Sequence, residues 1–202
     1  MSKRAEFDAS AMQVKYVTKD GVASWASLKT PHTFEGDDKS NYLITTIHPA
    51  EEVQDLVDLG NGLIEKCVDM MGKRPKMSPH DFHKTMEDGR VRLKWKRPFF
   101  KENDRMMATP PIKTYMPDGT AVDWEKTDWH VGNDSIVRIG GFLRPYYNTA
   151  LGLGISLRLD AVKIMTLIKY VPGQASNFDE FATDVSVAGS STSAETVTEA
   201  DF

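Results

Sequence analysis

Basic and aromatic residues are interleaved over residues 90–113, where the sequence has its clearest binding chemistry. Eight lysines and arginines lie in this stretch, and only Glu102 and Asp104 oppose them. Basic side chains attract phosphate groups, and aromatic rings stack on unpaired bases with about 1–3 kcal/mol per base. The stretch therefore predicts a surface for single-stranded nucleic acid. Its candidate DNA-binding residues are Arg90, Arg92, Lys94, Trp95, Lys96, Arg97 and Phe99.

The same stretch has a plainer interpretation, which rests on its alternation. Over residues 90–96 the basic residues share one face of a strand, and the apolar residues share the other face with Trp95. A solvated charged strand with Trp95 in the core therefore stays open beside a DNA-contacting Trp95. Phe99 follows a proline past this strand, where a buried ring and an exposed ring fit the sequence equally well.

A second cluster of basic and aromatic residues lies in the stretch RIGGFLRPYYN. Its candidate residues are Arg138, Arg144, Tyr146 and Tyr147. Successive residues of a strand point to opposite faces, so at least one of the two tyrosines is predicted to be exposed. An ordinary turn with one buried tyrosine is the alternative. Trp25, with Lys29 nearby, is a further candidate for the same DNA-binding surface.

A metal site is the main alternative chemistry. His80, Asp81 and His83 are residues that a metal-dependent nuclease could use, but no further ligand follows at a recognisable spacing. Cys67 is the sole cysteine, which excludes a zinc finger and an intrachain disulfide. The sequence has no phosphate-binding glycine loop and no nucleophile elbow. We therefore expect a binding protein without metal or cofactor, with a nuclease or a structural adaptor as the alternatives.

Most of the chain before the tail has the character of strands. Short runs rich in β-branched and aromatic residues occupy residues 22–28, 41–47, 90–96, 135–143 and 151–159. Residues 111–124 predict a hairpin that turns at residues 117–119, where Pro, Asp and Gly follow one another. These elements predict a mainly β fold.

One amphipathic helix is predicted over residues 48–72. Apolar residues recur there with helical spacing, and Gly72 is a suitable end. Gly60 and Gly62 weaken the middle, so a kink or two short helices are expected. Residues 77–89 are expected to hold a further helical turn.

The last strand region predicts a β-bulge. Apolar residues occupy odd positions over residues 151–159, and even positions from Val162 and Ile164 onward. A bulge near Asp160 would keep both sets on the same face, and bulged, bent strands are typical of small closed barrels. The sequence therefore predicts an OB-fold-like barrel of five or slightly more strands with one main helix, over residues 1–173.

Residues 174–202 differ from the rest of the chain. They hold six of the 29 acidic residues and none of the 25 lysines and arginines, so the remainder carries a net charge of about +2. Serine, threonine, alanine and acids dominate, which predicts a disordered acidic tail that can occupy a positive groove in place of phosphate. The start of the chain lacks the apolar segment of a secretion signal, and no apolar run is long enough for a membrane span. We therefore expect an intracellular protein.

The stretch RIGGFLRPYYNTALGLGISLRLDAVKIMTLI, followed by a polar tail that ends in EADF, resembles the single-stranded DNA-binding proteins of podophages with T-seven-like replication. The resemblance implies an OB-fold core that binds single-stranded DNA without sequence preference in replication, recombination and strand annealing. It implies a homodimer in the cytoplasm of the infected bacterial host. It also implies contacts of the acidic tail with the phage DNA polymerase and helicase-primase.

The resemblance also assigns roles to individual residues. Tyr146 matches the tyrosine of the Pro-Tyr motif and would stack on a base, while Arg138 stands where the family has strand lysines. Phe202 matches the terminal aromatic residue, and we expect the end of the tail to contact partners through Glu199, Asp201 and Phe202. This chain departs from the family in having few basic residues around Arg138, so phosphate binding is expected to rest on residues 90–113.

Overall fold

The structure is a computed structural model that describes residues 12–33, 40–100 and 108–171. The chain divides into two units, Met1–Tyr170 and Val171–Phe202, and the helices and strands that the structure describes belong to the first. The tail and its predicted boundary after residue 173 lie outside the described residues. No described helix combines the length and apolar character that a membrane crossing requires.

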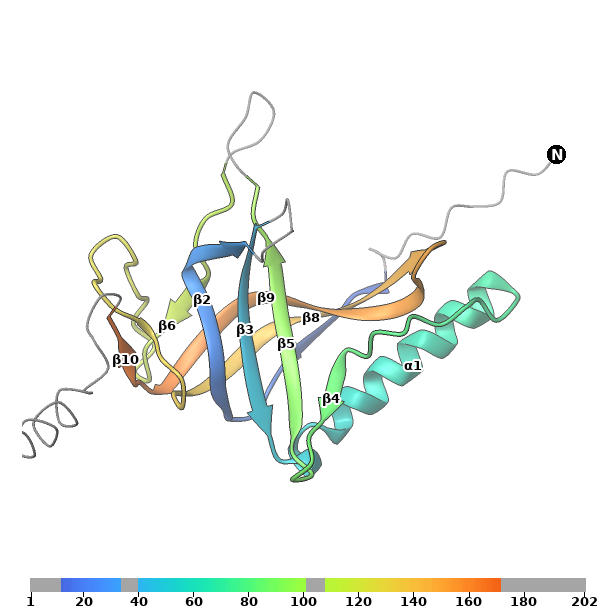
Figure 1. The fold of residues 1–202 in the computed structure, drawn as a ribbon, viewed down its shortest axis with the longest axis horizontal. Helices are drawn as coiled ribbons and strands as arrows, with labels where there is room; N and C mark the ends of the chain where they lie inside the picture. The colour runs from blue at the N-terminus through green and yellow to red at the C-terminus, as the bar shows by residue number, and fades with distance from the viewer. Residues whose placement is uncertain (1–11, 34–39, 101–107, 172–202) are drawn as a thin grey trace, which may run out of the picture. The chain divides into compact units, whose positions relative to one another are not determined.

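Five strands close into a barrel (Figure 1). The ring runs through β2, β3, β5, β9 and β8, and it closes because β8 pairs with both β9 and β2. All of these pairs are antiparallel except β5 and β9, which are parallel. The bounds are β2 Gly21–Thr33, β3 Ser40–His48, β5 Val91–Pro98, β8 Ile136–Asn148 and β9 Gly152–Thr166.

This ring has the five-stranded architecture of an OB-fold, which confirms the predicted fold class. Short strands extend the ring at its edges: β1 pairs with β8, β4 pairs with β5, and β6 pairs with β9. A separate two-stranded sheet joins β7 to β10. The bounds are β1 Val14–Val17, β4 His83–Thr85, β6 Lys113–Tyr115, β7 His130–Val131 and β10 Lys169–Tyr170.

The predicted bulge in the last long strand is confirmed at Asp160. Gly140 is the register partner of Ala161, and Gly141 is the partner of Leu159, so Asp160 is the extra residue. Leu153, Leu157 and Leu159 are buried before the bulge, and Val162 is buried after it at an even position, while Leu151 lies before the strand and is exposed. The extra residue thus keeps the apolar side chains of β9 in the core.

The core of the barrel is packed around Trp95, whose side chain is fully buried. Its indole lies against the backbone of Gly141, where a Cβ would lie 2.8 Å from the ring and would also clash with the carbonyl oxygen of Arg158. Gly141 is therefore required at this point by close approach of two strands and one ring. Gly140 has no such requirement, because a Cβ there would make an ordinary contact with Ala161 at 3.9 Å.

The helix α1 runs without interruption over Gln54–Met71, after a short 3-10 turn at Ala50–Glu52. The expected break at Gly60 and Gly62 is wrong. Gly60 instead makes room for the ring of Phe82, because a Cβ there would clash with the ring. The end at Gly72 is confirmed, with the residue in the left-handed conformation at φ 65°.

The further helical turn expected over residues 77–89 is also wrong. This segment is extended: Ser78 N–H donates to the carbonyl of Leu153 at 2.7 Å, and β4 pairs with β5. Its backbone groups are thus satisfied by neighbouring strands instead of a helix. The predicted turn at residues 117–119 is confirmed, since Gly119 has φ 89° and Tyr115 bridges Ala121.

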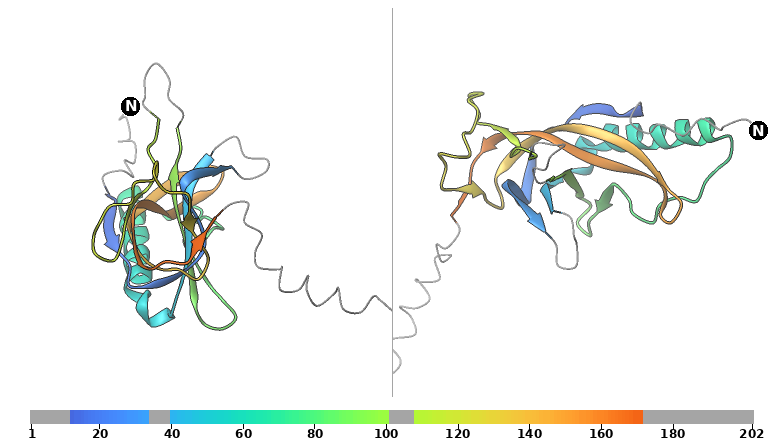
Figure 2. Two further views of the ribbon diagram at one scale, coloured as in Figure 1. Left: turned by 90° about the vertical axis from the view of Figure 1, so that its left-hand side faces the viewer. Right: turned by 90° about the horizontal axis from the view of Figure 1, so that it is seen from above.

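Figure 2 shows the hairpin of β8 and β9 running alongside α1, which it contacts.

Candidate nucleic-acid interface

The outer face of β5 carries a row of positive charge. Arg92, Lys94 and Lys96 are exposed, and the residues between them are buried in the barrel. Burial lowers the pKa of Lys94, and the charges of Lys96 and Arg92 lower it further. The row therefore concentrates positive charge that a phosphate group would neutralise. The alternation predicted from the sequence is confirmed.

Strand β9 brings a fourth cation to this row. Arg158 is the register partner of Lys96 across the parallel pair of strands. Burial lowers the pKa of Arg158, and the nearby charge of Arg144 on β8 lowers it further. Three strands thus supply one cationic strip. We use this name for Arg92, Lys94, Lys96, Arg144 and Arg158.

Sequence reasoning missed Arg158, although a signal for it existed. Its neighbours Leu157 and Leu159 are buried, so the alternation of this strand points residue 158 outward. The alternation that predicts burial of the apolar residues of β9 therefore also predicts that the side chain of Arg158 points outward. Arg144, by contrast, was predicted and lies beside Arg158.

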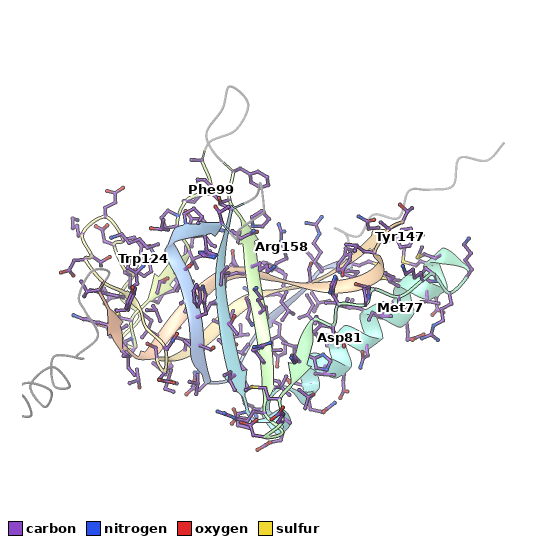
Figure 3. The ribbon with its side chains drawn as sticks, viewed as in Figure 1. Met77, Asp81, Phe99, Trp124, Tyr147 and Arg158 are labelled. Carbon is purple, nitrogen blue, oxygen red and sulfur yellow. The ribbon has the colours of Figure 1, made fainter. Side chains whose placement is uncertain are left out.

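Two adjoining hollows lie over four residues of the cationic strip, while Arg144 lies outside their lining. One has a volume of about 680 Å³ and the other about 530 Å³, and Asp81, Phe82 and Lys94 border both. Together they form one groove across β2, β3, β5 and β9, and Figure 3 shows the side chains of Asp81 and Arg158 beside β5. Other side chains that line the groove are Trp25, His32, Thr45, His80, His83, Lys84, Arg92, Lys96, Tyr146 and Arg158.

A bulge in β2 turns Trp25 into this groove. Ala23 pairs with Thr46 and Trp25 with Thr45, so Ser24 is an extra residue. Without it, Trp25 would face the core as Ala23 does. Its side chain is instead 51% exposed, and its ring meets His32 edge-on at 5.7 Å. Trp25, a candidate DNA-binding residue from the sequence, thus lines the groove with an exposed ring.

Tyr146 lies at the opposite end of the groove. Its hydroxyl shares a hydrogen bond of 2.9 Å with Ser78, and one face of its ring packs on Gly154, where a Cβ would lie 2.7 Å from the ring. The ring is therefore held in a fixed orientation along the groove. Tyr147 is 44% exposed and lies near the end of the β8–β9 hairpin (Figure 3), so at least one of the two tyrosines is exposed as predicted.

Three predicted DNA-binding residues face the wrong way. Trp95 is fully buried, so its ring is not available to a base. Arg97 follows Trp95 by two and lies on the same inner face, where its guanidinium donates to the carbonyls of Pro110 and Pro111 and covers the ring of Tyr42. Phe99 packs edge-on against the same ring. Trp95 is therefore corrected to a structural role, while Arg97 and Phe99 are half-buried and pack on Tyr42, away from the lining of the groove.

Two other predicted residues lie outside the groove's lining. Arg90 forms an ion pair of 2.6 Å with Asp88 at the turn before β5. Arg138 forms an ion pair with Asp20 on the outside of β8. Both guanidinium groups therefore have a carboxylate partner within the protein. The tail residues Glu199, Asp201 and Phe202 lie outside the described residues.

The three residues of the metal hypothesis line the groove instead. Among residues 12–33, 40–100 and 108–171, no cluster of three or more possible metal ligands is present. His80, Asp81 and His83 surround Phe82, whose ring meets that of His83 at 4.8 Å. Phe82 was also missed from the sequence. An aromatic ring set between polar residues was the available signal.

The comparison with solved structures follows this geometry. No protein-family model and no curated protein sequence matches the chain. Among solved structures, the chain is similar to gp2.5, a single-stranded DNA-binding protein of bacteriophage T7, with a TM-score of 0.66 and 19% identity over 90% of this chain and 100% of that one. It is also similar to the single-stranded DNA-binding protein of bacteriophage Enc34 in complex with single-stranded DNA, with a TM-score of 0.55 and 15% identity over 81% and 90% of the two chains. The chain therefore has the fold of the single-stranded DNA-binding proteins of bacteriophages.

Proposed function

We propose that this protein binds single-stranded DNA without sequence preference. The observation that carries the proposal is the groove, which lies over the cationic strip and has the exposed ring of Trp25 at one end and the half-buried ring of Tyr146 at the other. It lies on the face of β3 and β5, which are the second and third strands of the barrel. OB-folds bind oligonucleotides on this face.

The two kinds of side chain have separate tasks in this proposal. The cationic strip binds successive phosphates and releases their counterions, so binding weakens as salt increases. Trp25 and Tyr146 stack on bases, which requires the bases to be unpaired. Neither contact depends on which base is present, because every base has a flat face.

The likeness in fold supports the proposal. The similar protein of bacteriophage Enc34 has been seen with single-stranded DNA, and gp2.5 of bacteriophage T7 is named for the same activity. We infer a role of this chain in phage DNA replication, recombination and strand annealing, as a binding protein without catalytic activity. We place it in the cytoplasm of the infected bacterial host, and we propose that it acts as a homodimer.

The tail adds a second part to the proposal. Its six acids and its lack of basic residues suit a segment that competes with DNA for the cationic strip. DNA then displaces the tail, and Glu199, Asp201 and Phe202 become available to the phage DNA polymerase and helicase-primase. An aromatic ring beside carboxylates fits an apolar pocket with a basic rim.

Titration of the full-length protein with oligothymidylate tests the main proposal. We expect quenching of tryptophan fluorescence that weakens steeply with added salt, and a much smaller response to a duplex of equal length. An equal response to duplex, or none to oligothymidylate at low salt, would show that the groove does not bind single strands. Incubation of labelled DNA with magnesium separates binding from cleavage, since we expect the DNA to stay intact.

A further inference from the structure

The groove continues past Trp25 into a third hollow. This hollow has a volume of about 480 Å³ and shares Trp25 and His32 with the groove. Its opposite wall comes from the turn after β7 and from β10, segments that lie more than 90 residues away along the chain. The side chains that distinguish it from the groove are Thr30, Pro31, His130, Asn133 and Tyr170.

Aromatic rings stand on both walls of the hollow. Trp25 and His32 meet edge-on at 5.7 Å on one wall, and His130 and Tyr170 meet edge-on at 6.4 Å on the other. Tyr170 is 55% exposed, slightly more than Trp25. Two exposed aromatic rings on one hollow leave a large apolar surface in water, which is typical of a binding site.

The short sheet of β7 and β10 positions the second wall. Tyr170 is the register partner of His130, which brings their rings together. The neighbouring Lys169 lies over the ring of Trp129 at 5.9 Å, on the other side of β10. Alternation along β10 thus directs the lysine away from the hollow and the tyrosine into it.

We propose that this hollow is a nucleobase slot, in which Trp25 and Tyr170 hold a base of the bound strand. The proposal rests on the proposed function and extends the bound strand beyond the cationic strip. The lining residues are aromatic, small and apolar, or small and polar, and no lysine or arginine is among them, which suits a flat heterocycle better than a phosphate. Asn133 and Ser27 supply hydrogen-bonding groups that can adapt to any base edge.

The slot implies a minimum length for full binding. A DNA strand that runs from Tyr146 on β8 to the slot must cross β9, β5, β3 and β2, which spans about 19 Å at the usual distance between strands. A very short oligonucleotide can fill the cationic strip without reaching the slot. Contacts in the slot should therefore affect long oligonucleotides and not the shortest ones.

The decisive variant is Tyr170→Ala in the full-length protein, titrated with oligothymidylates of 3 to about 20 nucleotides. We expect a loss of about 5-fold to about 100-fold in affinity for the long oligonucleotides, as one stacked base would give, and no change for the shortest that binds. Tyr170→Phe keeps the ring and should bind like the wild type. Phe100→Ala, which removes an equally exposed ring outside the three hollows, should also leave binding unchanged.

If Tyr170→Ala binds long oligonucleotides as tightly as the wild type does, the proposed slot is contradicted. The proposed function is unaffected by that result, because the wild type still binds. Failure of the wild type to bind would instead contradict the proposed function. Photocrosslinking of wild-type protein to iodouracil-substituted oligonucleotides gives a second measurement that needs no variant. Crosslinks to Tyr170 or His130 are expected, and crosslinks confined to the Tyr146 end of the groove would also overturn the slot.

Discussion

Lys96 on β5 and Arg158 on β9 are register partners across the parallel pair of strands that helps to close the barrel. The pairing sets two positive charges side by side on the outer face. Burial around Arg158 disfavours its charge, and the nearby charge of Arg144 on β8 disfavours it further. An anionic ligand relieves both effects, which makes this pair the centre of the proposed phosphate contacts.

Replacement of Arg158 by alanine should weaken binding to single-stranded DNA. Loss of one phosphate contact should also reduce the slope of log affinity against log salt by about 0.7. Arg138→Ala is the matched control, because Arg138 is exposed and paired with Asp20 outside the groove. Salt titrations of the three proteins check the prediction, and an identical slope for wild type and Arg158→Ala would contradict it.

Quenching of fluorescence by DNA should come mainly from Trp25. Of the four tryptophans, Trp25 is 51% exposed, Trp129 is half-buried against Trp124, and Trp95 and Trp124 are buried. The variant Trp25→Phe retains an aromatic ring, so it should keep most of the affinity and lose most of the quenching. Anisotropy of a labelled oligonucleotide measures the affinity independently. Full quenching in Trp25→Phe would mean that DNA approaches a different part of the protein.

Gly141→Ala should lower the free energy of unfolding by about 1–3 kcal/mol, the usual cost of overpacking. The added methyl group would meet the ring of Trp95 and the carbonyl of Arg158. Gly62→Ala is the opposite case: nothing lies within 4 Å of its Cβ on the exposed face of α1, so it should gain about 0.5–1 kcal/mol. Denaturant unfolding of both variants gives the signs, and a neutral Gly141→Ala would contradict the tight packing.

The stability of the barrel should fall as the pH drops below about 6.5, and His48 should contribute to this fall. Burial lowers the pKa of His48, while the backbone of Asp20 and the charges of Glu52 and Asp20 act in the opposite direction. The folded state therefore takes up a proton less readily than the unfolded state does. The contribution of His48 is complete above about pH 6.5 and is lost as the pH falls toward its folded pKa.

The change in Tm between pH 7.5 and pH 5.5 measures this effect. His48→Gln should show a smaller change than the wild type, because the titrating group is gone. His80→Gln, at an exposed position, should behave like the wild type. Equal changes in all three proteins would mean that His48 does not set the acid sensitivity.

Deletion of residues 174–202 should tighten DNA binding, most of all at low salt. The reason is the removal of six acids that compete for the cationic strip. A full-length variant with Asn or Gln in place of the six acids separates charge from length and should bind as tightly as the deletion. Weaker or unchanged binding of both variants would show that the tail does not occupy the groove.

The local sequence determined the features that depend on alternation within one strand. The outward row of Arg92, Lys94 and Lys96, the burial of apolar residues in β9 and the bulge at Asp160 all follow from a period of two. The same alternation also places Trp95 in the core, so the prediction that its ring contacts DNA disagreed with the pattern of its own strand. The helical spacing of apolar residues likewise predicted α1, but it did not show why residue 60 is a glycine.

Tertiary structure alone decided the contacts between distant segments. The register of β5 on β9 set Arg158 beside Lys96, and an extra residue in β2, seen from its pairing with β3, turned Trp25 outward. Phe82 covers Gly60 because an extended segment returns along the helix. The physical reason is that side-chain alternation is a property of one strand. The register between strands and the contacts between distant segments depend on the packing of the whole barrel.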